Sequence, residues 1–217
     1  MEAVLFDMDG LLVDTERLAV RAWMDGAATM GAALSEATVL ETIGVDWEHT
    51  RRIIAAALPG GEGDFAALQR EVQAIYHHLL ETDLVVKPGA AELLAALKER
   101  GVPMGLATST TREGAERRLT KAGLLGYFSG SACGDEITNG KPAPDIFLLS
   151  ARRVGADPAR CVVLEDSPAG LRGAKDAGMR TIWVPDLVRP EGNGEHLADW
   201  LVKNLWEAKE ILFSLLV

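Results

Sequence analysis

Short apolar runs alternate with segments of helical periodicity along most of the chain. The first run, residues 3–6, leads directly into Asp7 and Asp9 and fits a strand buried on both faces. Similar runs follow at residues 102–107, 130–133, 161–164 and 180–184. Helical segments separate them, at about 90–100, 111–122, 144–154 and 168–178. This alternation predicts an α/β fold, a doubly wound and mostly parallel Rossmann-like sheet.

One stretch interrupts the alternation, because residues 14–83 show helical periodicity and contain no strand candidate. Helix starts are expected near Asp14, Ser35, Glu48 and Asp64. Residues 15–83 are therefore predicted to form an α-helical cap, inserted into a core made of residues 1–14 and 84–217. Its place directly after the first strand would allow it to close over the end of that strand.

The last segment is expected to be a helix that docks on the core. A stripe of apolar side chains supports this prediction, with a dimer contact as the alternative. The stripe consists of Leu201, Leu205, Trp206, Leu212 and Phe213.

Polar side chains gather where the predicted strands end. They are Asp7 and Asp9, Thr108 and Ser109, and Glu165 and Asp166. Because a parallel sheet collects the carboxyl ends of its strands along one edge, these groups should converge. An Asp-x-Asp pair by itself fits two solvated turn residues equally well, so the argument depends on the whole set.

The converging groups point to phosphoryl chemistry. Four carboxylates around one point call for a hard cation with oxygen ligands, for which we expect Mg²⁺. Lys141 lies between Gly140 and Pro142 on a stiff loop, and its ammonium group could bind phosphate oxygens together with a hydroxyl group. The predicted ligand is therefore a phosphoryl group.

Composition and charge narrow the class of protein. The chain has 217 residues, of which 48% are hydrophobic, enough to bury a full core. A net charge of −10 argues against a nucleic-acid surface, so an anionic substrate would need local cations. Asp7 comes too early for a signal peptide, and no apolar run approaches the roughly 20 residues of a membrane span, so we expect a cytoplasmic protein. Cys133 and Cys161 lack metal-ligand spacing and are expected to be buried free thiols.

Four motifs in order resemble those of the haloacid dehalogenase-like phosphohydrolases, in the subgroup with a helical cap after the first motif. The motifs are Asp7-Met-Asp9-Gly10-Leu-Leu-Val-Asp14-Thr15-Glu16, Ala107-Thr108-Ser109, Gly140-Lys141-Pro142-Ala-Pro144-Asp145-Ile-Phe147 and Leu164-Glu165-Asp166-Ser167. The resemblance covers nearly the whole chain. It implies a phosphatase that hydrolyses a small phosphorylated metabolite, such as a sugar phosphate or a nucleotide-like compound, through an aspartyl-phosphate.

The resemblance also implies a role for each motif residue. Asp7 would be the nucleophile and Asp9 the general acid and base. The phosphoryl oxygens would be held by Thr108, Ser109 and Lys141. The metal site would comprise Asp7, Asp166 and the backbone carbonyl of Asp9, with Glu165 as a ligand or as a neighbour of the ligands. The dehalogenase branch lacks the second aspartate, so Asp9 argues against dehalogenation.

The alternative functions are a β-phosphoglucomutase-type mutase and a non-catalytic phosphate-binding protein. The mutase pattern has a cap histidine where this chain has Ala19, and a cap arginine where it reads Gly44-Val-Asp46-Trp47. No lysine between Gly61 and Asp83 matches the cap lysine of the mutase. These differences favour a phosphatase, whereas the intact catalytic set argues against a purely binding protein.

Substrate specificity is expected to depend on Glu16 in the first motif and on cap residues. Trp47 is a candidate platform for a sugar or base, with ordinary cap packing as an equally good explanation, and Arg51 is a candidate anion contact. The expected partners are a small phosphorylated metabolite and no nucleic-acid polymer or membrane. We expect a monomer, with a dimer as the alternative.

Overall fold

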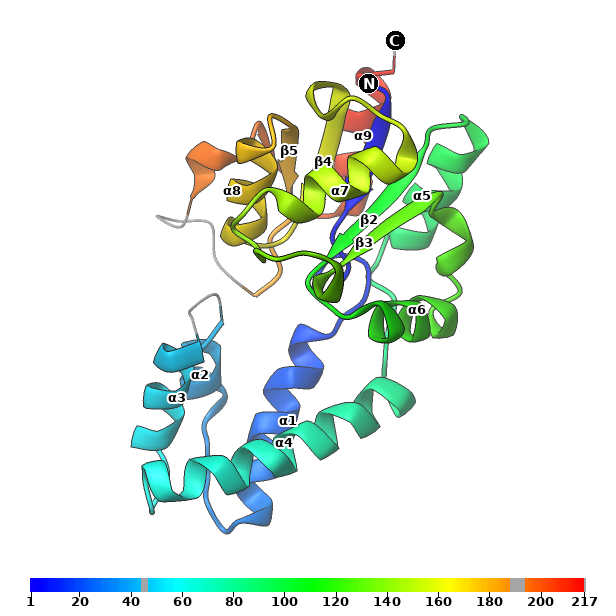
Figure 1. Cartoon of the computed structure of the whole chain (residues 1–217). Helices are drawn as coiled ribbons and strands as arrows, with labels where there is room; N and C mark the ends of the chain where they lie inside the picture. Colours follow the sequence, from blue (N-terminus) through cyan, green and yellow to red (C-terminus); the bar gives the residue numbers. More distant parts are fainter. Residues whose placement is uncertain (44–46, 188–193, 217) are drawn as a thin grey trace. The chain divides into compact units, whose positions relative to one another are not determined.

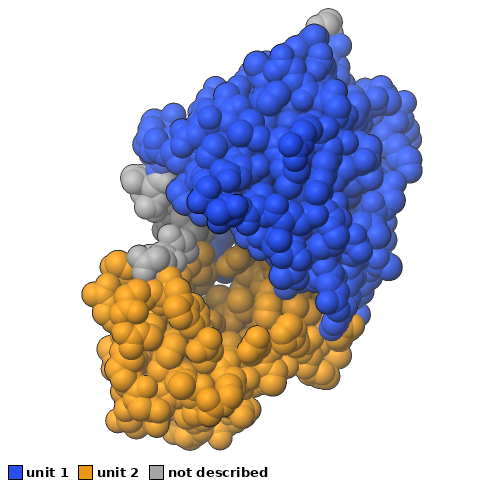
Figure 2. All heavy atoms as spheres, viewed as in Figure 1, with its two compact units in different colours: residues 1–13, 86–217 blue, residues 14–85 orange. Residues whose placement is uncertain are grey.

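The computed structural model describes residues 1–43, 47–187 and 194–216 (Figure 1). The chain divides into two compact units, shown in different colours in Figure 2. Residues 1–13 and 86–217 form the first, here called the core unit, and residues 14–85 form the second, the helical unit.

The core unit is built on a six-stranded sheet in the order β3-β2-β1-β4-β5-β6, in which every neighbouring pair is parallel. The strands are β1 (Ala3–Phe6), β2 (Met104–Thr108), β3 (Gly130–Cys133), β4 (Cys161–Glu165), β5 (Arg180–Trp183) and β6 (Trp200–Leu201). All residues of β1, β2 and β4 are buried, as expected for central strands covered on both faces. The predicted α/β fold with a mostly parallel sheet is confirmed.

Helices cover both faces of this sheet (Figure 1). They are α5 (Ala90–Glu99), α6 (Arg112–Lys121), α7 (Asp145–Val154), α8 (Pro168–Asp176) and α9 (Leu205–Ser214). Helix α7 packs on β1, β2 and β3, and α8 packs on β4 and β5. On this side, Ile146 and Phe147 of α7 join Leu5 and Val163 in one buried cluster. Short 3-10 helices span Leu125–Tyr127, Gly134–Glu136, Pro158–Arg160 and Glu195–Leu197.

The helical unit contains α1 (Glu16–Thr29), α2 (Glu36–Leu40), α3 (Trp47–Ala56) and α4 (Glu62–Thr82). Ser35 caps α2 by accepting a hydrogen bond from the Thr38 N–H at 3.1 Å, so the helix start predicted there is confirmed. Helices α1 and α4 pack closely at Gly26, where an added Cβ would lie 2.9 Å from Val72. This unit therefore has its own small apolar core.

The prediction for the C-terminal segment was wrong at Leu201. This residue belongs to the short edge strand β6, where it pairs with Trp183 and is 48% exposed. Helix α9 begins only at Leu205, because the Asn204 side chain caps it by accepting a hydrogen bond from the Glu207 N–H. Leu205 and Leu212 are buried as expected. Trp206 remains 46% exposed and Phe213 is partly buried.

Cys133 and Cys161 are both buried and free, which confirms the prediction for the thiols. Within the described residues, no helix is long and apolar enough to cross a bilayer.

Candidate active site

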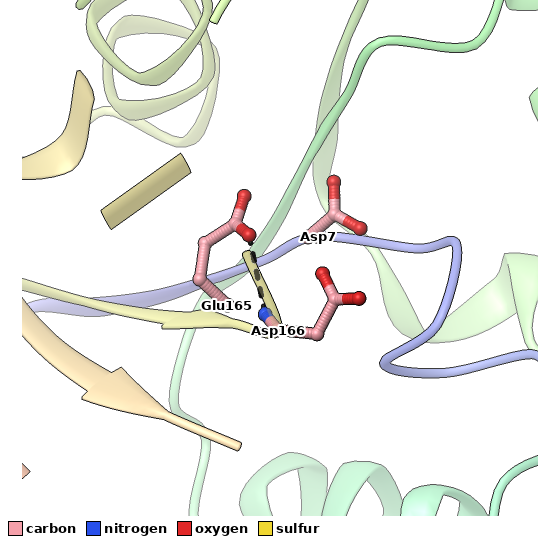
Figure 3. A group of neighbouring side chains, drawn as sticks. All are labelled: Asp7, Glu165 and Asp166. Atoms are coloured by element: carbon pink, nitrogen blue, oxygen red, sulfur yellow. Dashed lines mark hydrogen bonds between the residues drawn. The ribbon is translucent and has the colours of Figure 1, made fainter. Parts of the chain in front are cut away.

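The register of the central strands brings carboxylates from two strands together. Phe6 pairs with Leu164, so Asp7 follows β1 directly beside Glu165, the last residue of β4. Figure 3 shows Asp7 on the segment after β1, with Glu165 and Asp166 adjacent at the end of β4. One carboxylate oxygen from each of the three residues lies within 4.8 Å of the others.

Lys141 places an ammonium group among these carboxylates. Its Nζ donates hydrogen bonds to Asp7 Oδ1 and, at 2.5 Å, to Glu165 Oε1. The side chains of Lys141, Asp7 and Glu165 are 9%, 8% and 0% exposed, so these ion pairs are shielded from water. The loop that carries Lys141 leads into α7, whose Phe147 ring lies 5.2 Å from Nζ.

The charges of this cluster do not balance. Three carboxylates beside one ammonium leave a formal charge of −2. Burial raises the pKa of the Asp7 carboxyl to about 8, because Glu165 and Asp9 act in the same direction and Lys141 only partly opposes them. Burial lowers the pKa of Lys141, but the two carboxylates outweigh this effect and raise it overall. Oxygen donors with this residual charge fit a divalent hard cation.

Hydrogen bonds and close packing fix the position of the Glu165 carboxylate. Its Oε2 accepts hydrogen bonds from the Ser167 hydroxyl at 2.9 Å and from the Ser167 N–H at 3.2 Å, at the start of α8. An added Cβ on Gly170 would lie 2.0 Å from the Glu165 carboxyl carbon, so only glycine leaves room for this carboxylate. The sequence therefore positions Glu165 through both the cap and the first turn of α8.

The backbone of Asp166 is fixed from the next strand. The indole N–H of Trp183, a fully buried residue of β5, donates a hydrogen bond to the Asp166 carbonyl oxygen at 2.8 Å. From the same strand end, the Val184 N–H donates a hydrogen bond to the Glu165 carbonyl oxygen at 2.8 Å. These bonds hold the end of β4 in place.

Asp9 lies in a second hydrogen-bonded group. Its Oδ2 accepts a hydrogen bond from Thr110 Oγ1 at 2.7 Å and lies 3.5 Å from Thr108 Oγ1. Its Oδ1 accepts a hydrogen bond from the Arg118 guanidinium at 2.6 Å. The structure thus places Thr108 beside Asp9, whereas Ser109 is exposed.

Sequence reasoning missed Thr110 and Arg118. Thr110 belongs to the same hydroxyl cluster as Thr108 and could have been included on that ground. Arg118 lies in α6, ten residues after Thr108 in the sequence, and no motif or spacing marks it. Only the packing of α6 beside the ends of the strands brings its guanidinium to Asp9.

The three specificity candidates lie in the helical unit. Glu16 is the first residue of α1 and is partly buried. Trp47 is 52% exposed, and its ring centroid lies 5.7 Å from that of Phe65. Arg51 forms ion pairs with Glu48, at 2.6 Å, and with Glu62. The rest of the loop considered in the sequence, residues 44–46, lies outside the described residues.

Comparison with known proteins identifies the family. Residues 1–178 match the haloacid dehalogenase-like hydrolase family. The chain belongs to this family. The match includes the segments that carry Asp7, Lys141 and Asp166, the groups that converge at the end of the sheet.

Two similar proteins are phosphatases by name. The chain is 34% identical to the "Phosphorylated carbohydrates phosphatase" of Thermotoga maritima over 215 residues, 98% of this chain and 97% of that protein. It is also 34% identical to "Hexitol phosphatase B" of Escherichia coli K12 over 216 residues, 97% of this chain and 96% of that protein. The prediction of a phosphoric monoester hydrolase is thereby confirmed.

A solved structure with the same fold comes from Thermotoga maritima and is described as a candidate β-phosphoglucomutase. It is 33% identical, with a TM-score of 0.83, and the match covers 99% of both chains. Its agreement over the whole chain supports the Rossmann-like fold. The names of the two phosphatases above favour hydrolysis over the mutase alternative.

Proposed function

We propose that the protein is a Mg²⁺-dependent phosphatase that hydrolyses a small phosphorylated sugar through an aspartyl-phosphate on Asp7. The observation that carries this proposal is the largely buried group formed by Asp7, Lys141, Glu165 and Asp166. It combines a carboxylate nucleophile with a cation that can neutralise phosphoryl oxygens.

Asp7 and Asp9 would divide the chemistry between them. An Asp7 carboxylate oxygen forms a bond to phosphorus while the bond from phosphorus to the sugar oxygen breaks, and Asp9 gives its proton to that oxygen. Asp9, now a carboxylate, then takes a proton from water as the water oxygen attacks phosphorus. The bond from phosphorus to Asp7 breaks, which releases phosphate and restores both aspartates.

The phosphoryl group would be held by Lys141, Thr108 and Ser109. Lys141 already lies beside the Asp7 oxygen, so it can stabilise negative charge where it develops. Thr108 is fully buried, and its hydroxyl is fixed by accepting a hydrogen bond from the Thr110 N–H at 3.2 Å. A fixed hydroxyl loses little conformational freedom when a ligand binds.

Asp7, Asp166 and the backbone carbonyl of Asp9 would hold the metal ion. The fit rests on these oxygen donors and on the formal charge of −2 that the whole cluster of Asp7, Glu165, Asp166 and Lys141 carries. A bound Mg²⁺ would neutralise phosphoryl oxygens and keep the carboxylates from repelling the substrate. Both oxygens of Glu165 are engaged by Lys141 and Ser167, so we assign Glu165 to support the ligands and Lys141.

The substrate class is taken from the two relatives, which are named for phosphorylated carbohydrates and hexitols. We propose residues 15–83 as the cap that selects among such compounds. Trp47 remains a candidate sugar platform because half of its surface is exposed. Arg51 is a weaker candidate for a substrate contact, because its guanidinium is already paired with two carboxylates. Glu16 is a candidate specificity residue because of its place in the first motif.

A panel of hexose, hexitol and pentose phosphates, with and without Mg²⁺, tests this function by measuring phosphate release. We expect at least one sugar phosphate to be hydrolysed, with turnover lost after exhaustive chelation and restored by Mg²⁺. Asp7→Asn should abolish turnover while preserving the circular dichroism spectrum. Undiminished activity in the chelated enzyme or in this variant would overturn the proposal.

Product analysis separates hydrolysis from phosphoryl migration. With β-glucose 1-phosphate and a trace of the 1,6-bisphosphate, a phosphatase releases inorganic phosphate faster than it forms glucose 6-phosphate. The reverse order would restore the mutase alternative.

A further inference from the structure

An arginine outside the sequence motifs contacts the proposed acid and base. Arg118 Nη1 donates hydrogen bonds to Asp9 Oδ1 at 2.6 Å and to Thr110 Oγ1 at 3.1 Å. The Thr110 hydroxyl donates in turn to Asp9 Oδ2 at 2.7 Å. The three side chains thus form a closed ring of hydrogen bonds around one carboxylate.

The ring is partly shielded from water, and its arginine lies on an anchored helix. The side chains of Arg118 and Asp9 are 15% and 24% exposed, so their attraction is screened less than that of a surface pair. Helix α6 is anchored at its first turn, where Thr111 caps it and Arg112 donates hydrogen bonds to Glu136 at 2.6 and 3.1 Å. Arg118 therefore approaches Asp9 from a rigid element.

This arrangement fixes the orientation of the carboxylate plane. Arg118 holds Oδ1, and Thr110 holds Oδ2 with Thr108 at 3.5 Å on the same oxygen. Rotation of the carboxylate would break two short charge-assisted hydrogen bonds, one of them from a guanidinium. A general acid or base depends on such a fixed orientation, because proton transfer requires hydrogen-bond geometry with the reacting oxygen.

We propose that Arg118, together with Thr110, is a positioning residue that orients Asp9 for proton transfer. The inference rests on the proposed function, in which Asp9 protonates the sugar oxygen that leaves phosphorus. Arg118 acts through Asp9 and need not contact the substrate. Its loss should therefore matter most where the leaving oxygen needs a proton.

Two kinds of substrate distinguish a role of Arg118 in proton transfer from a role that does not involve proton transfer. A sugar alkoxide is a poor leaving group and needs protonation, whereas p-nitrophenolate leaves readily without it. We expect Arg118→Gln to lower kcat/KM for the sugar phosphate by about 10- to 100-fold and that for p-nitrophenyl phosphate by less than about threefold. The comparison uses kcat/KM because it reports the steps up to departure of the leaving group.

The variants are Arg118→Gln, Arg118→Lys and Thr110→Val. For each, kcat/KM for both substrates is measured at saturating Mg²⁺, and the melting temperature is determined as well. Arg118→Lys should recover part of the activity, because an ammonium can still donate to Asp9. Arg117→Gln is the matched control, since it makes the same change at the neighbouring exposed position of α6 and should leave both substrates unaffected. If Arg118→Gln does not fold, Arg118→Lys and Thr110→Val still give the substrate comparison.

Asp9→Asn distinguishes failure of this inference from failure of the proposed function. It should show the same substrate preference more strongly, and adding Arg118→Gln to Asp9→Asn should cause no further loss. An unimpaired Asp9→Asn enzyme would overturn the proposed role of Asp9. If Asp9→Asn is impaired, any of three results would overturn the positioning role of Arg118 alone. The activity of Arg118→Gln would be unchanged, would fall equally for both substrates, or would fall further in the double variant than in Asp9→Asn.

Discussion

Two groups of ion pairs, one in each unit, combine the same charges in different surroundings. In the core unit, Lys141 binds Asp7 and Glu165 with side chains that are at most 9% exposed. In the helical unit, Arg51 binds Glu48 and Glu62 with side chains that are 35–60% exposed. Each group is one cation between two carboxylates, so the number of contacts does not distinguish them.

Burial is what separates the two groups. Water screens the Arg51 pairs, and their loss leaves charges that can be hydrated again. Loss of Lys141 would leave carboxylates that water cannot reach. The effect of a substitution should therefore follow the exposure of the charges involved.

The largest effect is expected for Lys141→Met. This change removes the cation from Asp7 and Glu165 and from the proposed phosphoryl site, so kcat/KM should fall by about 10³-fold or more. Steady-state kinetics with the best sugar phosphate measures this loss. Lys175→Met is the control, because it removes a 2.6 Å pair with Asp199 whose side chains are 31–32% exposed, and it should retain activity.

The next largest effect is expected for Gly170→Ala. The new methyl group would lie 2.0 Å from the Glu165 carboxyl carbon, so this buried carboxylate must move away from Lys141 and Ser167. We expect the free energy of unfolding to fall by about 3 kcal/mol or more, as measured by urea denaturation.

Gly63→Ala is the matched control for Gly170→Ala. Gly63 lies in α4, and apart from its chain neighbours and the backbone of its own helix, an added Cβ there would meet no atom within 4 Å. Alanine should leave stability unchanged or raise it by up to about 1 kcal/mol. Equal destabilisation by the two alanines would show that space around Glu165 is not the cause.

The side chain of Glu136 is 22% exposed, which lies between the exposures of the Lys141 group and the Arg51 group. Hydrogen bonds from Arg153 and Arg112 lower the pKa of its carboxyl to about 2. A lowered pKa means that the stabilisation is complete above the ordinary Glu pKa of about 4.3 and is lost as the pH falls toward 2. Because both arginines are about one-third exposed, we expect a contribution of only about 1–2 kcal/mol.

Urea denaturation of the wild type and of Glu136→Gln across this pH range tests that expectation. Their difference in unfolding free energy should be constant above about pH 5 and shrink progressively below it. A difference that stays constant down to pH 2 would contradict the lowered pKa.

The smallest effect is expected for Arg51→Gln. Its partners are exposed, so the melting temperature should not change measurably. If Arg51 contacts the substrate, the variant should raise KM for the sugar phosphate without changing kcat for p-nitrophenyl phosphate. Unchanged kinetics for the whole panel would remove Arg51 from the specificity candidates, and a large drop in stability would break the relation between exposure and effect.

Much of the core unit could be predicted because its signals are local. The apolar runs that form β1, β2 and β4 and the cap residue Ser167 act within a few positions of the chain. Leu201 was misplaced because its apolar side chain fits a helix stripe as well as a strand. Leu201 forms a strand because it pairs with Trp183 of β5, 18 positions away. Such a long-range pairing cannot be recognised from local periodicity.

Apolar runs followed by polar residues mark where the strands end, and the parallel topology then requires Asp7, Glu165 and Asp166 to meet. The partner that each charge takes follows from tertiary packing and not from the order of residues. Lys141 pairs with Asp7 and Glu165, whereas Arg118 pairs with Asp9, 109 positions away in the sequence. Residue type sets what a side chain can bind, but packing sets the distance and the access of water, on which the strength of every charge interaction depends.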